Sequence, residues 1–146
     1  MRRIVCVGVF LCFGVFGRVA GQERPPPLGE QDPGFTLEQN YPNPINTETR
    51  IPFELYESLF VEEGSATVSI RVYNILYQFV AAPVALGFPG GEGLPMLQLE
   101  YTSPGEYEAY WDGRDRTGRQ VASGVYFVQM VVNGREPVIR RMFVTK

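Results

Sequence analysis

The stretch "EYEAYWDGRDRTGRQVASGVYFVQMVVNG", residues 106–134, contains two strand patterns, a polar connection and a hairpin signal. Apolar and polar residues alternate in its first part, which predicts a strand whose inward series is Tyr107, Ala109 and Trp111. The run "GVYFVQMVV", residues 124–132, is apolar on both sides and predicts a central strand covered on both faces. Asn133-Gly134 is a strong signal for a two-residue hairpin turn. Together these features predict antiparallel β structure.

The polar connection between these two strands holds the only Trp of the chain and two aspartates, Asp112 and Asp115. It loosely resembles an acidic calcium loop, but it lacks further carboxylates at alternating positions and a closing glutamate. We favour a tight connection in which both aspartates cap backbone N–H groups and Gly113 and Gly118 supply positive φ. Trp111 then belongs to the core. Calcium binding by the two aspartates is kept as the weaker alternative.

Further strand patterns occur on both sides of this stretch. In "RIPFEL" and "ATVSIRVYN" the expected inward residues are Ile51, Phe53, Leu55, Val68, Ile70 and Val72. Pro52 cannot donate a ladder hydrogen bond, so we expect either an edge strand or the start of a strand at this position. "LYQFVA" extends the pairing after a turn near Asn74, and "MLQLEY" places Leu97, Leu99 and Tyr101 inward.

The segment "APVALGFPGGEGLP", residues 82–95, is rich in Gly and Pro and predicts a loop, whereas "PVIRRMFVTK" forms the closing strand. We count seven or eight short strands and no convincing helix. The predicted fold class is therefore all-β, an Ig-like antiparallel β-sandwich of about seven strands. The Cys pair of antibody-type domains is absent, so the prediction concerns the architecture alone.

The N-terminal part of the chain has the composition of a targeting segment. "MRR" precedes the apolar run "IVCVGVFLCFGVFG", which is short for a membrane span, and small residues follow up to Gly21. Residues 1–21 are therefore predicted to be a secretory signal peptide, with an uncleaved N-terminal anchor as the alternative. Residues 22–34 are Pro-rich and polar, which predicts a flexible linker. The folded domain is expected over residues 35–146.

Composition argues against most kinds of chemistry. The chain has no His, and both cysteines, Cys6 and Cys12, lie in the predicted signal peptide. The commonest general base, the commonest metal ligand and a thiol nucleophile are thus missing from the mature chain. Removing three arginines with the signal peptide changes the net charge from −3 to −6, which argues against nucleic acid binding. We expect a protein that is not an enzyme and uses no cofactor or metal.

Four motifs resemble, in the same order, the C-terminal sorting domains (type A) of the type IX secretion system: "LEQNYPNPINTETRIPFEL", "VSIRVYNIL", "PGEYEAYWDGRDRTGRQVASGVYFVQMVVNG" and "RRMFVTK". The related Ig-like domain of the flagellar hook-capping protein shares this pattern. The resemblance covers residues 35–146. It implies a seven-stranded sandwich and an export address that an outer-membrane translocon reads. The matching positions are Pro42, Asn43, Pro44, Gly105, Tyr107, Gly124, Tyr126, Arg140, Arg141 and Lys146.

The resemblance also implies a route and a partner. The protein would cross the inner membrane by its signal peptide, pass through the periplasm and reach the cell surface or the medium, with no stable membrane span after signal removal. Its partner would be a protein, either a translocon component or a surface assembly component, and we expect an exposed edge strand to be able to pair with it. Two departures stand out: an expanded loop at residues 81–100 and no large cargo before the domain.

Two other functions stay open at this point. The first is an extracellular Ig-like assembly or adhesion module, such as the hook-capping scaffold. The second is a sugar-binding module that uses outward aromatic residues such as Tyr73, Tyr77 and Tyr110. The fold alone does not decide among these functions.

Overall fold

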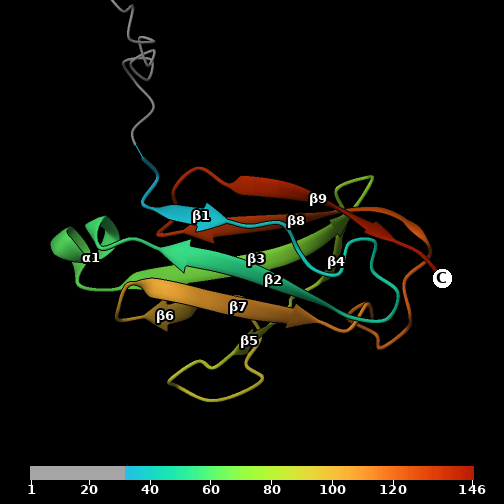
Figure 1. Ribbon diagram of the computed structural model, residues 1–146, viewed down its shortest axis with the longest axis horizontal. Helices are drawn as coiled ribbons and strands as arrows, with labels where there is room; N and C mark the ends of the chain where they lie inside the picture. Colours follow the sequence, from blue (N-terminus) through green and yellow to red (C-terminus); the bar gives the residue numbers. More distant parts are fainter. Residues whose placement is uncertain (1–31) are drawn as a thin grey trace, which may run out of the picture. The chain divides into compact units, whose positions relative to one another are not determined.

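The computed structural model describes residues 32–146, which form two β-sheets packed face to face (Figure 1). The predicted signal peptide and most of the predicted linker lie outside the described residues. Strand β1 begins at Phe35, directly after the predicted linker. In the described part, no helix has the length and apolar character needed to cross a bilayer.

All strand pairs within the two sheets are antiparallel. The first sheet contains, in spatial order, β1 (Phe35–Leu37), β2 (Thr49–Leu55), β7 (Gly105–Trp111) and β5 (Val84–Leu86). The second contains β4 (Phe79–Ala81), β3 (Ala66–Asn74), β8 (Gly124–Val132) and β9 (Val138–Val144), with β6 (Leu99–Tyr101) also paired to β3. This order corresponds to strands ABED against C′CFG of an immunoglobulin-type domain. The predicted Ig-like β-sandwich is confirmed.

The core lies between the two sheets and follows the predicted alternation. The fully buried residues include every member of the two predicted inward series: Ile51, Phe53, Leu55, Val68, Ile70 and Val72. On β7, Ala109 and Trp111 are buried and Tyr107 is half-buried. The Tyr107 ring lies 5.7 Å from that of Phe53 and 4.6 Å from that of Tyr101, centroid to centroid. Removing such side chains from water supplies the main driving force for joining the sheets.

Trp111 and Tyr126 connect the two sheets near one end of the sandwich. Their ring centroids are 5.9 Å apart, and both residues are buried. Trp111 Nε1 donates to the Arg114 carbonyl at 2.9 Å, and the Tyr126 hydroxyl donates to the Ala122 carbonyl at 2.8 Å. The second bond has the geometry of a tyrosine corner at the start of an F strand. Both aromatic residues are thus core anchors, as the sequence predicts for Trp111.

The 112–123 connection, the segment between β7 and β8, is built by its own aspartates. Asp112 Oδ1 accepts a hydrogen bond from the Arg114 N–H at 3.0 Å. Asp115 Oδ1 accepts from the Thr117 N–H, the Thr117 hydroxyl and the Arg119 N–H, at 2.9, 2.6 and 3.1 Å. Gly113 (φ 69°) and Gly118 (φ 85°) occupy the left-handed region. The predicted roles of the aspartates as turn caps are confirmed.

The hairpin between β8 and β9 also has its predicted form. Asn133 and Gly134 have φ of 53° and 67°, and the Arg135 N–H donates to the Val132 carbonyl at 2.9 Å. Positive φ at both central positions is the signature of a type I′ turn, whose twist matches that of the strands it joins.

One helix departs from the prediction that the chain has none. The helix α1 spans Ser58–Glu63 and ends at Gly64, which has φ 71° and donates its N–H to the Phe60 carbonyl. Its six residues include a single buried position, Leu59, and it has no side-chain N-cap. Because the helix is barely longer than one turn, no apolar periodicity could mark it in the sequence.

The prediction that Pro52 marks an edge strand is wrong. Strand β2 lies between β1 and β7. The Pro52 carbonyl accepts from the Glu38 N–H at 2.9 Å, and the nitrogen and oxygen of one strand residue point to the same side. The missing N–H of Pro52 therefore faces the place where β1 ends, at Leu37, and the pairing with β7 is intact.

Other predictions fail in the expanded region and on β8. Part of the predicted 82–95 loop is strand β5, which pairs with β7. In "MLQLEY" Tyr101 is buried as predicted and Leu99 is half-buried, but Leu97 is 43% exposed and Met96 is fully buried instead. Strand β8 is central but is covered on one face only, because its outward residues are merely half-buried: Val125, Phe127, Gln129 and Val131.

Candidate recognition surface at the C-terminal strand

Strand β9 is at the edge of the second sheet, and its free side is occupied by residues 39–45. The Ile45 N–H donates to the Phe143 carbonyl at 2.6 Å, and the Thr145 N–H donates to the Ile45 carbonyl at 2.8 Å. The Phe143 N–H donates to Asn43 Oδ1 at 3.1 Å. Residues 39–45 together with residues 140–146 are called the C-terminal junction below.

Two buried polar side chains hold the first half of the junction. Asn40 and Thr49 are each 1% exposed, and Asn40 Nδ2 donates to Thr49 Oγ1 at 3.0 Å. Both side chains also donate to the Pro42 carbonyl, at 3.2 and 3.1 Å. The peptide bonds before Pro42 and Pro44 are both cis. Buried polar groups with all their hydrogen bonds made hold the backbone in one conformation. Any other conformation would leave a buried donor or acceptor without a partner, which costs free energy.

Two further bonds connect β9 to the first half of the chain. Arg140 Nε donates to the Leu37 carbonyl at 2.9 Å, so this side chain bridges from β9 to β1 in the other sheet. Gln39 Nε2 donates to the Arg141 carbonyl at 3.0 Å. The side chains of Arg141 and Lys146 are exposed, and within residues 32–146 the one salt bridge is elsewhere, between Arg50 and Glu108. The junction therefore presents Arg141 and Lys146 to solvent, beside Arg140, which is also exposed but is bonded to the Leu37 carbonyl.

The fold gathers most, but not all, of the predicted recognition residues. Pro42, Asn43 and Pro44 lie beside the end of β9, which carries Arg140 and Arg141, and Lys146 follows two residues after the strand. On the neighbouring strand, Gly124 pairs with Val144 and Tyr126 with Met142. Gly105 and Tyr107 are separate from this group, because they pair with Leu55 and Phe53 toward the far end of β2. Gly105 begins β7 and Tyr107 packs against the core, so neither residue belongs to the junction.

Sequence reasoning missed Gln39, Asn40 and Thr49, and it gave no sign of the partner of Asn43. Asparagine in a turn commonly bonds to nearby backbone, but Asn43 Oδ1 accepts from the Phe143 N–H, 100 residues away. Gln39 and its partner Arg141 are 102 residues apart. A local sequence pattern does not indicate hydrogen bonds between residues about a hundred positions apart. The one available signal is the dense cluster of amides and prolines in "QNYPNP" itself.

The sheet edges are less open than expected. An exposed edge strand was predicted as a pairing site, but the free side of β9 from Arg141 to Thr145 already has partners. At β5, the Ala85 N–H donates to the Leu94 carbonyl at 2.8 Å, and at β4 the Val80 carbonyl accepts from the Arg116 N–H at 2.9 Å. Loops that cover edges in this way prevent uncontrolled strand addition.

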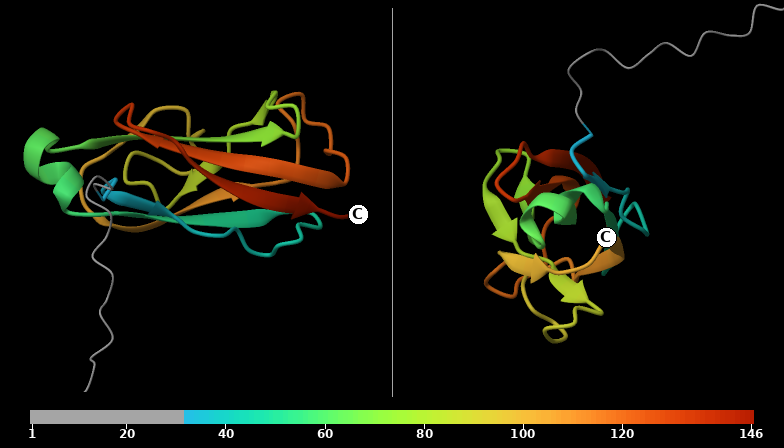
Figure 2. Two further views of the ribbon diagram at one scale, coloured as in Figure 1. Left: turned by 90° about the horizontal axis from the view of Figure 1, so that it is seen from above. Right: turned by 90° about the vertical axis from the view of Figure 1, so that its left-hand side faces the viewer.

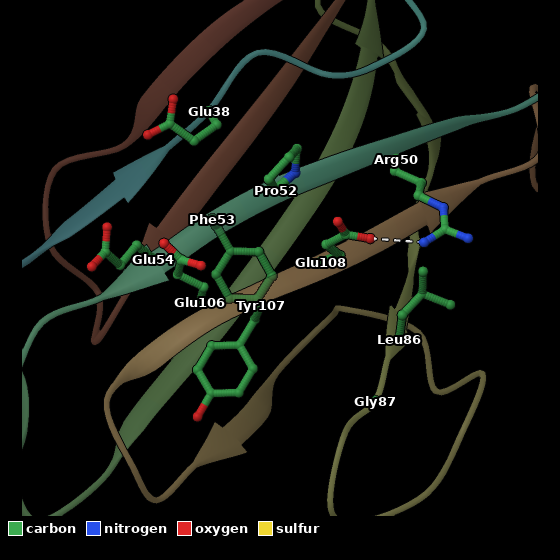
Figure 3. Close-up of a pocket in the computed structure, with 10 residues that line it drawn as sticks. All are labelled: Glu38, Arg50, Pro52, Phe53, Glu54, Leu86, Gly87, Glu106, Tyr107 and Glu108. Atoms are coloured by element: carbon green, nitrogen blue, oxygen red, sulfur yellow. Dashed lines mark hydrogen bonds and ion pairs between the residues drawn. The ribbon is translucent and has the colours of Figure 1, made fainter.

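A shallow groove of about 700 Å³ lies on the outer face of the first sheet (Figure 3). Glu54 is directly opposite Glu106, and Glu108 Oε2 pairs with Arg50 Nη1 at 3.1 Å. The Tyr41 hydroxyl donates to Glu108, and this bond, with the pairing to Arg50, lowers the pKa of the Glu108 carboxyl. Among the described residues no group of three or more His, Cys, Asp or Glu is arranged to hold a metal ion.

Comparisons with known proteins give likenesses of fold only. No family model and no curated protein matches the chain. The solved structure of dimeric latent PorU from Porphyromonas gingivalis is 17% identical, with a TM-score of 0.48 over 75% of this chain and 9% of that one. PorZ, described as an essential bacterial surface component of the type IX secretion system of P. gingivalis, is 18% identical, with a TM-score of 0.43 over 74% and 11%.

A third solved structure is the DNA glycosylase AlkC from Pseudomonas fluorescens, at 13% identity and a TM-score of 0.45, covering 77% of this chain and 31% of that one. The chain thus spans about a tenth of PorU and of PorZ. Because each TM-score is below 0.5, these likenesses assign no function to this chain.

Proposed function

We propose that this protein is a secreted, non-enzymatic domain that serves as an address for type IX export and surface attachment. The support is the ordered motif series that resembles type A sorting domains. One observation carries the proposal. The motif near the start of the domain and the motif at its C-terminus, about a hundred residues apart, meet in the C-terminal junction. A receptor that reads the junction would read a folded domain with its terminus in place.

The junction favours recognition by side chains over strand addition. Its backbone groups from Arg141 to Thr145 are already paired, whereas the cationic side chains of Arg141 and Lys146 are exposed. The proposed partner is therefore a translocon protein with an acidic surface, which would gain charge complementarity and orientation from these two cations. The proposal requires no cofactor and no metal.

The test is an export assay in a host that has a type IX translocon. A reporter is inserted between the predicted signal peptide and residue 32, and Arg141→Gln/Lys146→Gln is compared with the parent sequence. We expect the double variant to stay in the periplasm, because it loses the two exposed cations of the junction that form no bond to β1, without losing a backbone bond. Arg135→Gln, an exposed arginine at the β8–β9 turn, is the matched control and should be exported normally.

Normal export of the folded double variant would contradict a sorting role for the junction. Export of the parent sequence from a host that lacks the translocon would instead favour the alternative, an extracellular Ig-like assembly module. The two functions are thus separated by the host as well as by the variant.

A further inference from the structure

The turn between β3 and β4 has a fixed backbone. Asn74 Oδ1 accepts from the N–H groups of Leu76 and Gln78 at 3.0 and 2.9 Å, and Asn74 Nδ2 donates to Gln78 Oε1 at 2.9 Å. The Tyr77 N–H donates to the Asn74 carbonyl, also at 2.9 Å. Asn74 therefore provides most of the hydrogen bonds that hold the turn. The side chains of residues 75–77 are not needed to hold it.

Those side chains are apolar and face water. Ile75, Leu76 and Tyr77 are 65%, 74% and 58% exposed. Polar residues and glycine are the usual occupants of such turns. We call these three residues the apolar tip. Contiguous exposed apolar residues on a secreted domain mark a surface that contacts something else.

Tyr77 occupies a backbone position that disfavours it. Its φ is 57°, in the left-handed region where a bulky residue is an outlier. The ring stacks on Phe127 with centroids 5.0 Å apart and planes at 7°, and Tyr73 lies 6.4 Å away. The stacking secures the ring against Phe127 of β8, and Tyr77 directly follows the exposed Ile75 and Leu76 in the chain. The aromatic cluster thus supports a tip of two protruding aliphatic side chains.

Two arginines lie near the ends of this turn. The 112–123 connection contacts β4, because the Arg116 N–H donates to the Val80 carbonyl, and the left view of Figure 2 shows it next to the β3–β4 turn. A hollow between the two segments is lined by Asn74, Gln78, Arg116 and Arg119, among others. Arg116 and Arg119 are exposed, and the nearby Asp115 carboxylate already accepts three hydrogen bonds from its own turn.

We infer that the apolar tip docks into the interfacial layer of an anionic lipid bilayer, with Arg116 and Arg119 on the lipid headgroups. Each kind of residue suits one layer of a bilayer. The aliphatic side chains suit the acyl chains, the aromatic ring suits the interface, and the arginines suit the anionic headgroups. Aliphatic side chains offer no flat ring for stacking a sugar, and a small convex tip offers a protein partner little area. The inference does not rest on the proposed export function.

The test places a fluorophore at the tip. Leu76→Trp is prepared in the full chain and titrated with vesicles of phosphatidylcholine and phosphatidylglycerol whose acyl chains are brominated. Val61→Trp is the matched control, because Val61 is 76% exposed on α1 at the other end of the sandwich (Figure 1). Both variants carry the apolar N-terminal run and the buried Trp111, so these contribute equally.

We expect the emission of Leu76→Trp to shift to the blue and to be quenched on anionic vesicles, and that of Val61→Trp to change much less. Adding Arg116→Gln/Arg119→Gln should weaken vesicle binding roughly fivefold for each charge removed. Circular dichroism verifies the fold of each variant, and Ile75→Trp replaces Leu76→Trp if that variant does not fold.

Three results would overturn the inference. Equal quenching of the tip and control tryptophans would show that the N-terminal run alone holds the chain on the vesicle. An unchanged tip spectrum would show that the tip stays in water. A blue shift that depends on protein concentration without vesicles would show that the tip is covered by a second copy of the chain.

Discussion

The 112–123 connection and the C-terminal junction lie at the same end of the sandwich (Figure 1), but they are held together in opposite ways. In the connection, Asp112 and Asp115 bond to backbone groups two to four residues away. In the junction, Asn43 and Gln39 bond to residues about a hundred positions away. The first segment can form as soon as the chain turns, whereas the second forms only when both ends of the domain are in place.

The loss of a hydrogen bond should therefore have different consequences for the rest of the fold in the two regions. A lost cap in the connection leaves the rest of the sandwich paired. A lost bond in the junction loosens β9, which lies at an edge and carries the chain terminus. Four predictions examine this difference, and they are ordered by the size of the expected effect.

Trp111→Ala should lower the stability most, because the Trp111 side chain joins the 112–123 connection to the hydrophobic core. Truncating a buried aromatic residue costs about 3–5 kcal/mol of the free energy of unfolding. The loss should appear as a lower urea midpoint with an unchanged slope. Trp111→Phe retains most of the packing and removes the bond to the Arg114 carbonyl, so it should cost clearly less. Similar losses for both variants would show that this one hydrogen bond dominates.

Asn40→Ala should cost about 1–3 kcal/mol, because it breaks a buried network and leaves Thr49 and the Pro42 carbonyl with fewer partners. Hydrogen exchange should report the location of the damage. The amides of Ile45, Phe143 and Thr145 should lose protection beyond the global change, while those of β7 should not. A uniform loss of protection would mean that the junction unfolds only together with the whole domain.

Asn43→Ala and Asp115→Ala form a matched pair, each removing the side-chain acceptor of one region. Asn43→Ala should cost about 1 kcal/mol, and it should speed exchange at Phe143, 100 residues away. Asp115→Ala should speed exchange at Thr117 and Arg119 and leave β9 unchanged. Faster exchange at Phe143 in the Asp115 variant would contradict the claim that the connection is locally built.

The contrast also explains what could be predicted from the sequence. The inward series of β2 and β3, the Asn133-Gly134 hairpin and the roles of Asp112 and Asp115 depend on spacing of a few residues, and these are confirmed. The fold class follows from the same alternation. The acceptor role of Asn43 toward Phe143 and the bridge from Arg140 to β1 depend on long-range contacts that composition and periodicity do not encode. The buried pair Asn40 and Thr49 is closer in the chain, but it too lies outside any strand alternation.

The failed predictions have the same cause. Pro52 was assigned to an edge because a proline removes one donor, but the side on which that donor is missing depends on where β1 ends. The 82–95 segment was assigned to a loop because of its glycines and prolines, but β7 offers β5 a free edge. In both cases a neighbouring strand overrode the local signal.

The smallest expected effect is the loss of stability at low pH. The Thr117 hydroxyl and the Arg119 N–H lower the pKa of Asp115, and the bond from Tyr41 and the pairing with Arg50 lower that of Glu108. A carboxyl group whose pKa is lower in the folded state stabilises the fold above its unfolded pKa, and this contribution disappears as pH falls through its folded pKa. Both groups are partly exposed to solvent, so their contributions are small.

Carbon-detected NMR titration should place both carboxyl groups below their ordinary values. Because the Asp115 contacts are within one turn, its titration should leave the Phe143 amide shift unchanged. Glu108 differs, because Tyr41 lies within the junction, and its protonation should move the amide shifts of Tyr41 and Asn43. If added salt raised the pKa of Asp115 as much as that of Glu108, charge attraction and not hydrogen bonding would hold the connection, and its self-contained construction would have to be abandoned.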